Sequence, residues 1–404
     1  MTGTLMPSPS RPAVDPRVIA TRGHGFVIAA TAFLTLVDLF AVQSVLPNLA
    51  IRYAVSPSEI AVAANACTLG MALASLATAI WGGGINRRFG ITASLTLLAL
   101  PTAALAIAPD LLVFTALRVI QGALMASAFT LMLAHLGEHF CPVSRPIAFA
   151  AFVTGNVLSN FIGRIVSANV ADLYGIPITF LAFAGLNLAG AALVWHTVRH
   201  ETGTGGEAEP APAGAWRRHL AQPALRAAFL VGFLILFAFI GVFSFVNFVL
   251  SRPPISLSTM AIGWIYLVFL PALPTTLMMG RLIARFGARR SIQGMLLLAL
   301  LGLPLLALAD LRAMLGGLVL VAIGTFAAQA GATGFVSSAA TEAKSTASGL
   351  YLASYFSGGI VGSWILGIVF DRMGWHACLI AIALALACAG LVTRQFAPRT
   401  ASTA

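Results

Sequence analysis

The sequence predicts an all-α membrane protein with twelve transmembrane helices in two pseudo-symmetric six-helix bundles. The first of three observations behind this prediction is composition. Of the 404 residues, 59% are hydrophobic and only 9% are charged, and the mean hydropathy is +0.95. An ordinary soluble domain carries roughly 25% charged residues. Most of this chain must therefore face lipid or other apolar helices.

The second observation is an internal repeat with a period of about 200 residues. Three sets of residues recur in order: Arg88-Phe89-Gly90 as Arg285-Phe286-Gly287, the spaced trio Gly163, Asp172 and Gly175 as Gly362, Asp371 and Gly374, and more weakly Val55-Ser56-Pro57-Ser58 as Ile255-Ser256-Leu257-Ser258. The chain is thus one membrane unit written twice in the same orientation. Parallel repeats of this kind, related by an axis along the membrane normal, are a transporter architecture with the substrate site between the halves.

The third observation is the number of apolar runs, since a span needs about 20 apolar residues to cross a hydrocarbon core of about 30 Å. On that rule the spans fall at 25–49, 59–82, 92–108, 111–134, 146–170, 177–198, 224–250, 259–280, 291–308, 313–336, 347–370 and 376–395.

The spans divide the chain into domains. We expect a cytoplasmic N-terminal tail at 1–24, an N-terminal bundle at 25–198, a cytoplasmic linker at 199–223, a C-terminal bundle at 224–395 and a cytoplasmic tail at 396–404. The linker is rich in Gly, Glu and Pro, a composition that cannot bury a core. The N-terminal tail holds no apolar stretch to cleave, so a signal peptide is not expected.

The positive charges predict the orientation. Seventeen of the 23 Lys and Arg residues fall in segments on the side of the N-terminus, four fall on the opposite side, and Arg118 and Arg164 lie within spans. Cytoplasmic loops carry the excess of Lys and Arg, so both termini are predicted in the cytoplasm of a bacterial inner membrane. The formal net charge of +11 follows from this placement, and no nucleic-acid partner is expected.

Two charged residues are candidates for proton coupling. Asp38 in the first span and Arg118 in the fourth can each lie roughly 20 Å from the cytoplasmic face, at about 1.5 Å per residue. Ionisable groups within a span are expensive and mark function by default. No second acidic residue lies in the middle of a predicted span, so Asp38 is the first candidate for an acidic proton carrier. A static ion pair, or a polar group packed against the backbone, is the alternative.

Other polar and aromatic residues predict a substrate cavity. Asn156, Asn160 and Arg164 share one helical face, beside a row of small residues that favours close helix contact. Span 11 repeats such a row in Ser354, Gly358 and Gly362. Snorkelling to the outer interface is the alternative for Arg164. The predicted cavity residues are Gln43, Gln121, Asn156, Asn160, Arg164, Asn247, Tyr351 and Tyr355. A packed helix interface is as good an explanation for either tyrosine alone.

One catalytic pattern needs weighing. The run His135-Leu136-Gly137-Glu138-His139 matches the H-x-x-E-H arrangement of zinc proteases. So short a pattern often arises by chance, and it stands where the fourth span leaves the membrane. We therefore expect no enzyme, no catalytic residues, no metal site and no cofactor.

These residues resemble the major facilitator superfamily over nearly the whole chain. Val37-Asp38-Leu39 through Pro47 is similar to the first-span motif of drug:proton antiporters, with Asp and Pro at the same spacing. Leu117-Arg118-Val119-Ile120-Gln121-Gly122 resembles the fourth-span motif, whose Arg the resemblance implicates in proton coupling. Together with Asn156, Gly163-Arg164 and Gly358-Gly359, the pattern is similar to bacterial twelve-span efflux permeases, including sugar (arabinose) exporters.

Two segments depart from the family pattern. In the loop between spans 2 and 3, Arg87 stands where the family has the Asp of its cytoplasmic latch, and the antiporter motif of span 5 lacks its Pro near Gly163. The resemblance still implies a cytoplasmic gate built from the two copies of the loop motif: Gly83, Arg87, Arg88, Gly90, Gly280, Arg285 and Gly287.

Together these features predict a monomeric secondary transporter in the lipid bilayer that exchanges protons for a small organic solute, drug-like or sugar, and exports it by alternating access. Uptake of a small metabolite by proton symport is the alternative within transport. From other classes, a non-transporting membrane sensor and an intramembrane zinc hydrolase stay open. The identity of the solute cannot be predicted, because a cavity is shaped by helices far apart in the chain.

Overall fold

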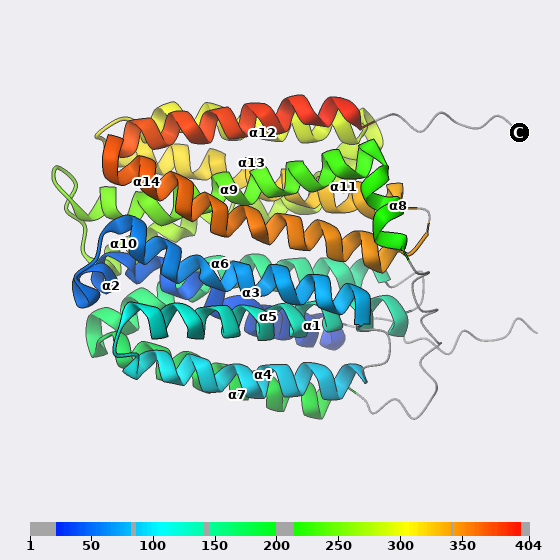
Figure 1. The fold of residues 1–404 in the computed structure, drawn as a ribbon, viewed down its shortest axis with the longest axis horizontal. Coiled ribbons are helices and arrows are strands. Elements are labelled where there is room, and N and C mark those ends of the chain that lie inside the picture. The colour runs from blue at the N-terminus through cyan, green and yellow to red at the C-terminus, as the bar shows by residue number, and fades with distance from the viewer. Residues whose placement is uncertain (1–21, 82–85, 141–144, 199–213, 341, 397–404) are drawn as a thin grey trace, which may run out of the picture.

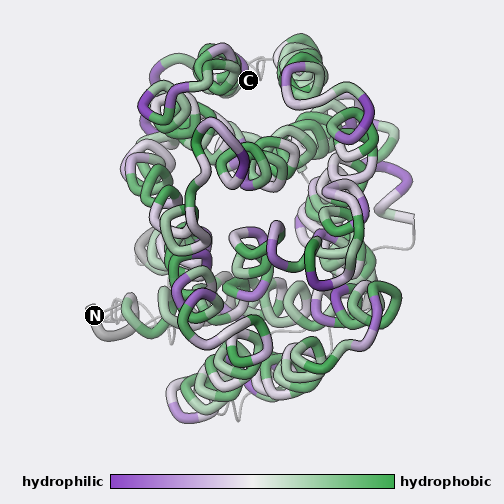
Figure 2. Tube along the Cα trace, turned by 90° about the vertical axis from the view of Figure 1, so that its left-hand side faces the viewer, coloured by the Kyte–Doolittle hydropathy of each residue, from purple (hydrophilic) through white to green (hydrophobic). Residues whose placement is uncertain are grey.

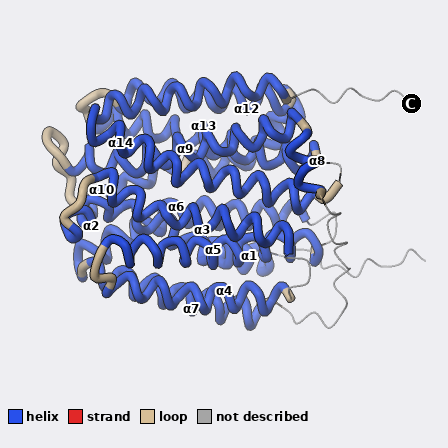
Figure 3. The backbone as a smooth tube through the Cα atoms, in the orientation of Figure 1, coloured by secondary structure: helices blue, strands red, loops and turns tan. Residues whose placement is uncertain are grey.

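The computed structural model describes residues 22–81, 86–140, 145–198, 214–340 and 342–396. These residues form long, nearly parallel helices and no β-strand (Figure 1, Figure 3). The helices are α1 (Arg22–Ala41), α2 (Leu46–Tyr53), α3 (Pro57–Trp81), α4 (Arg87–Ala104), α5 (Leu111–His139), α6 (Arg145–Tyr174), α7 (Ile176–Thr197), α8 (Ala215–Ala221), α9 (Pro223–Ser251), α10 (Thr259–Ile265), α11 (Ala272–Phe286), α12 (Ala288–Leu306), α13 (Leu311–Ala339) and α14 (Lys344–Val392). The 3-10 turns are η1 (Val42–Val45), η3 (Leu105–Ile107), η4 (Tyr266–Phe269) and η5 (Thr393–Gln395).

Eleven helical segments among the described residues are long and apolar enough to cross a membrane, and they overlap all twelve predicted spans. The last two spans form the single element α14, which turns at Gly374, where φ is +81°. A straight helix of 49 residues would reach about 74 Å at about 1.5 Å per residue, more than twice a hydrocarbon core. Figure 1 shows the chain reversing there, so α14 supplies two antiparallel spans.

Two predicted spans are interrupted helices. The first runs through α1, η1 and α2, and the eighth through α10, η4 and α11. Segments of 3-10 helix within a span often mark functional hinges. Both interruptions lie toward the end of the molecule where α2 and α10 are found, which we call the α10 end; the opposite end is the α8 end (Figure 1).

The repeat is visible in the packing. Gly163 of α6 packs on Val37 of α1, where an added Cβ would lie 2.9 Å from Val37 Cγ2, and Gly362 of α14 packs on Phe237 of α9, where a Cβ would lie 2.8 Å from the Phe237 carbonyl oxygen. These contacts are repeat equivalents, about 200 residues apart. Small residues thus let the helices approach closely in each half, as the small-residue rows predict.

Gly175 and Gly374 are also equivalent, with φ of +86° and +81°. Each supplies the left-handed backbone at the corner between the last two spans of its half, a conformation that glycine adopts readily. The Arg-Phe-Gly copies differ in conformation. Gly287 has φ of +81° between α11 and α12, whereas Gly90 lies in the first turn of α4.

The halves meet along α3 and α14, and at the α10 end through α10 with α6 and α2 with α9. Hydrophobic residues predominate around the rim of the molecule when it is viewed along the helices (Figure 2). This surface suits a lipid environment.

The predicted linker, 199–223, is partly helical. Its first part, 199–213, lies outside the described residues, but Ala215–Ala221 forms α8 and Pro223 begins α9. Arg218 of α8 pairs with Glu342 before α14 at 3.4 Å. The Gly- and Glu-rich composition that predicted a solvated linker is confined to residues 199–213. The rest of the predicted linker includes the apolar residues Trp216 and Leu220.

Candidate functional site

Asp38 lies near the middle of the first span with only 3% of its surface exposed. One carboxylate oxygen accepts hydrogen bonds from Asn187 Nδ2 at 2.7 Å and from Thr102 Oγ1 at 3.3 Å. Asn187 is on α7 and Thr102 on α4. Three helices of the first half therefore converge on this carboxylate, and the donors are neutral.

Arg118 of α5 is fully buried next to Asp38. Its guanidinium donates to the backbone carbonyls of Asp38 at 3.2 Å, Leu39 at 3.4 Å and Ala64 at 2.8 Å. Cys67 Sγ accepts a further bond at 2.9 Å. The expected common depth of Asp38 and Arg118 is thus confirmed as direct contact.

The two side chains, however, make no direct ion pair. Arg118 Nη1 donates to Gln121 Oε1 at 2.7 Å, and Gln121 Nε2 donates to Thr102 Oγ1 at 2.7 Å. Thr102 has one hydroxyl proton, for which the Leu98 carbonyl at 2.8 Å and the Asp38 carboxylate at 3.3 Å compete. A static Asp38–Arg118 ion pair is therefore wrong for this structure. The guanidinium instead bonds the carbonyls of Asp38 and Leu39 in the last turn of α1 and the carbonyl of Ala64 in α3.

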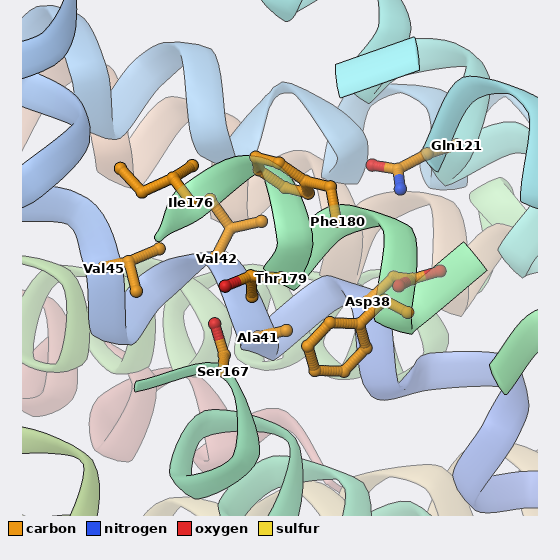
Figure 4. Close-up of a pocket in the computed structure, with 10 residues that line it drawn as sticks. Asp38, Ala41, Val42, Val45, Gln121, Ser167, Ile176, Thr179 and Phe180 are labelled. Carbon is orange, nitrogen blue, oxygen red and sulfur yellow. The ribbon is translucent and has the colours of Figure 1, made fainter. Parts of the chain in front are cut away.

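A small cavity adjoins Asp38 (Figure 4). Its volume is about 10 Å³, close to the space that one water molecule requires. The polar residues that line it are Asp38, Gln121, Ser167 and Thr179, and Ser167 Oγ is a buried hydroxyl without a hydrogen-bond partner. All four belong to the first half, so this cavity is separate from the predicted cavity between the halves, which stays a prediction.

A second polar network crosses between the halves. Arg164 of α6 donates to Gln43 Oε1 of η1 and to the Asn160 carbonyl, the latter at 2.9 Å. Asn247 of α9 donates to the Gln43 carbonyl at 2.7 Å, and Tyr266 of η4 donates to Asn247 Oδ1 at 2.7 Å. Four predicted cavity residues, Gln43, Asn160, Arg164 and Asn247, are thereby brought together.

Asn65 of α3 extends this network. It accepts from Gln43 Nε2 at 3.1 Å and donates to Ser244 Oγ of α9 at 3.1 Å. Polar contacts therefore link α3 and η1 of the first half to α9 of the second. Because each group is buried, leaving any of them unpaired would be costly.

Arg164 does not snorkel. Its side chain is 0% exposed, so the alternative of an outer-interface position is wrong. The helix places it on the inner face of α6, among the rings of Phe40 and Tyr266, with its charged carbon 4.9 Å and 4.3 Å from the ring centres.

Other predicted cavity residues lie elsewhere. Tyr351 and Tyr355 stack on each other, 6.2 Å between ring centres, but Tyr351 lies only two turns from the start of α14 at the α8 end, whereas Asn247 is one turn from the opposite end of α9. They lie apart from the Asn247 network, and their place in a substrate cavity stays a prediction. Asn156 contributes its backbone carbonyl, which accepts from Ser159 Oγ at 2.6 Å, and its side chain joins neither network.

The predicted gate residues that the structure describes lie toward the α8 end. Arg88 stacks over the Trp195 ring at 4.1 Å and bonds the Trp195 carbonyl, and Arg285 stacks over Phe286 at 5.2 Å. Arg87 and Gly90 occupy the first turn of α4, and Gly83 lies outside the described residues. These contacts are within one half each, so a gating role stays a prediction.

Sequence reasoning overlooked five members of the networks: Asn65, Thr102, Asn187, Ser244 and Tyr266. The two asparagines carried a usable signal, because an amide in an otherwise apolar span needs a hydrogen-bond partner. Thr102, Ser244 and Tyr266 carried none, since such residues are common in spans. For the H-x-x-E-H segment, His135 is buried, the side chains of Gly137–His139 lie outside the described residues, and the part of the chain that is described holds no cluster of three metal-ligating side chains.

The protein is helical and multi-pass, and it consists of two repeated halves with polar networks buried at and beside their seam. These features are typical of membrane transport proteins. The Major Facilitator Superfamily model matches residues 28–266 and 254–403. The chain belongs to this superfamily.

Curated relatives agree with this assignment. The chain is 25% identical over 364 residues to the uncharacterized MFS-type transporter YybF of Bacillus subtilis, covering 87% of each chain. It is 24% identical over 366 residues to the inner membrane transport protein YnfM of Escherichia coli, covering 89% of this chain and 86% of that protein. The chain is thus a multi-pass transporter with bacterial relatives.

Solved structures confirm the fold. A bacterial homolog of the human lysosomal transporter Spinster, in an inward-facing and occupied conformation, superposes with a TM-score of 0.74 at 15% identity, covering 93% of this chain and 97% of that one. A point mutant of the nucleoside transporter NupG superposes with a TM-score of 0.70 at 13% identity, covering 93% of this chain and 99% of that one.

Proposed function

We propose that this protein is a proton-coupled secondary transporter of the bacterial inner membrane that exports a small organic solute by alternating access. The observation that carries the proposal is the Asp38 carboxylate, buried in the middle of a span and held by the neutral donors Asn187 and Thr102. A carboxyl group so placed is costly when charged, which favours a role in which it takes up and releases a proton.

The hydrogen-bond chain gives protonation of Asp38 a structural consequence. A charged carboxylate attracts the Arg118 guanidinium through the intervening Thr102 and Gln121. Protonation removes that attraction. Arg118 also bonds the backbone of α1 and, through Ala64, of α3, so a change at Asp38 reaches two helices that line the seam. The cavity beside Asp38 provides room for a water molecule to carry the proton.

The present conformation fits one state of an alternating-access cycle. The excess of Lys and Arg in the segments at the α8 end supports a cytoplasmic location for that end. The halves are tied together at the α10 end by Asn247 with Gln43, and by Thr259 with Asn48 at 3.1 Å. We therefore assign this arrangement to a state of the cycle in which the outer side is closed.

The proton gradient supplies enough energy for export. One positive charge moving inward through about 100 mV releases about 2.3 kcal/mol, which concentrates a neutral solute tens of times. Drug-like compounds and sugars are the solute classes to test first, because the sequence resembles exporters of both.

The test begins with a thermal-shift screen of candidate solutes on purified protein, followed by counterflow in proteoliposomes. A stabilising solute should exchange across the membrane. In vesicles that hold the protein inside-out, an acidic lumen should drive the solute into the vesicle while protons leave it. Counterflow with no response to any proton gradient would reject proton coupling. Movement in the same direction as protons would establish uptake by symport instead.

A further inference from the structure

Arg164 is a buried cation without an acidic partner. It is 0% exposed, and no ion pair involves it in the described part of the chain. Its bonds go to Gln43 Oε1 and to the carbonyl and Oδ1 oxygens of Asn160, all neutral acceptors. Its Nε is a buried donor with no partner. A guanidinium keeps its charge in proteins, so this position carries an uncompensated positive charge.

The free donor lies where an oxyanion would bind. Nε and Nη2 point along the same edge of the planar guanidinium, the edge that a carboxylate engages with two parallel hydrogen bonds. In this structure the Gln43 amide oxygen occupies the Nη2 position and the Nε position is unfilled. Gln43 is thus a neutral group in the place of one oxygen of an anion.

Aromatic rings surround the same guanidinium. Its central carbon lies 4.3 Å from the ring centre of Tyr266, 4.9 Å from those of Phe40 and Phe269, 5.8 Å from Phe243 and 5.9 Å from Phe239. The ring faces attract the cation but supply no net negative charge. They do supply apolar walls for the body of a ligand whose charged end reaches Arg164.

The rings divide unequally between the halves. Arg164 and Phe40 belong to the first half, whereas Phe239 and Phe243 on α9 and Tyr266 on η4 belong to the second. Separation of the halves at the α10 end would withdraw most of the rings from the guanidinium. The charge would then need another partner, which a bound anion supplies.

The charges deep in the membrane also favour an anion. The described spans hold Asp38, Arg118 and Arg164 away from their ends, so their sum is positive even when Asp38 is ionised. This field repels an organic cation and attracts an anion. A membrane potential that is negative inside also drives an anion outward, the direction assigned to the transporter.

We propose that Arg164 is the anion subsite of the transport pathway and that the transported solute is an organic anion. Its carboxylate, or a group of like geometry, docks on the Nε and Nη2 edge in place of Gln43, and its apolar part lies against Phe40, the ring that stays with Arg164 in the first half. The inference rests on the proposed function in one respect only, that the protein carries a small organic solute.

Binding of three compounds of one shape and different charge tests the proposal. Benzoate, benzamide and benzamidine are titrated against the purified full-length protein in detergent at neutral pH, without any proton gradient, with intrinsic tryptophan fluorescence as the readout. We expect saturable binding of benzoate in the millimolar range and none of the other two. In Arg164→Gln, benzoate should bind about 10-fold to 100-fold more weakly, the loss expected for charge-assisted hydrogen bonds.

Two variants guard against misfolding and nonspecific charge effects. Arg164→Lys keeps the charge without the two-pronged edge and should bind with intermediate affinity, whereas Arg312→Gln removes a cation at the start of α13 and should leave binding unchanged. Benzamide or benzamidine binding as well as benzoate would overturn the proposal, and so would no benzoate binding to the wild type. Unchanged benzoate affinity in Arg164→Gln, with lowered thermal stability, would show that Arg164 only clamps the halves.

The outcome is separable from proton coupling. Because no gradient is present, failure of Asp38 as a proton carrier would leave benzoate binding intact. Failure of benzoate to bind would leave proton-driven transport of a neutral solute untouched.

Discussion

Replacement of Asn247 by leucine should open the α10 end. Asn247 donates to the Gln43 carbonyl across the seam at 2.7 Å, and accepts from Tyr266 within its own half. Leucine keeps a similar volume and removes the bond between the halves. Interhelical hydrogen bonds in membranes contribute about 0.6 kcal/mol on average and about 1.7 kcal/mol at most. Loss of this bond should therefore raise the ratio of open to closed molecules by about 3-fold to about 18-fold.

Distances between spin labels on Arg52 and Arg252, both exposed at the α10 end, measure that ratio. Both positions are replaced by cysteine in a background lacking Cys141 and Cys388, since Cys67 and Cys378 are buried. Pulsed electron paramagnetic resonance should show a larger long-distance population in Asn247→Leu.

The matched control is Asn169→Leu, because Asn169 bonds only the Ile165 carbonyl of its own helix, at 2.7 Å. An unchanged distance distribution in Asn247→Leu, or an equal shift in the control, would refute the closing role of the Asn247–Gln43 bond.

Three further substitutions test the packing and the networks. Gly362→Ala should lower the free energy of unfolding by about 1–3 kcal/mol, because the added Cβ would meet the Phe237 backbone. The thermal unfolding temperature in detergent should fall accordingly, whereas in Gly185→Ala, whose Cβ meets nothing within 4 Å, it should not. Arg118→Lys should abolish counterflow despite keeping the charge, since an ammonium cannot reach Gln121 and the carbonyls of two helices together; normal counterflow would remove the hydrogen-bond chain from the mechanism. Asp371→Asn should weaken closure at the α10 end, because the Asp371 carboxylate accepts a hydrogen bond from the Ser58 backbone N–H across the seam at 3.2 Å. Equal labelling of a cysteine at position 252 by a thiol reagent, with and without Asp371→Asn, would contradict this.

The sequence predicted the elements that depend on local pattern. Apolar runs located the spans to within a few residues, and the spacing of Gly163 and Gly362 anticipated the close helix pairs of both halves. The twelve-span count is confirmed, although the last two spans join at Gly374 as one helical element. Such features can be read from sequence because they follow from length, hydropathy and residue size along a single segment.

The site was predicted less completely because its geometry depends on several helices at once. The contact of Asp38 with Arg118 followed from depth alone, but the bonds of the guanidinium to carbonyls of both α1 and α3 depend on how these helices pack, which no motif marks. Asn187 comes from a helix about 150 residues away along the chain. The distance of Tyr351 from Asn247 could not be predicted for a similar reason, since helical spacing correctly pairs Tyr351 with Tyr355 and says nothing of contacts between helices.

Proton movement evoked by the solute tests the central claim most directly. Proteoliposomes loaded with a pH-sensitive dye receive a solute identified by thermal shift, for wild type, for Asp38→Asn and for Asp172→Asn, an exposed acid at the end of α6. We expect solute-evoked proton flux in the wild type and in Asp172→Asn, and none in Asp38→Asn, which should still bind the solute. Undiminished proton flux in Asp38→Asn would contradict the account.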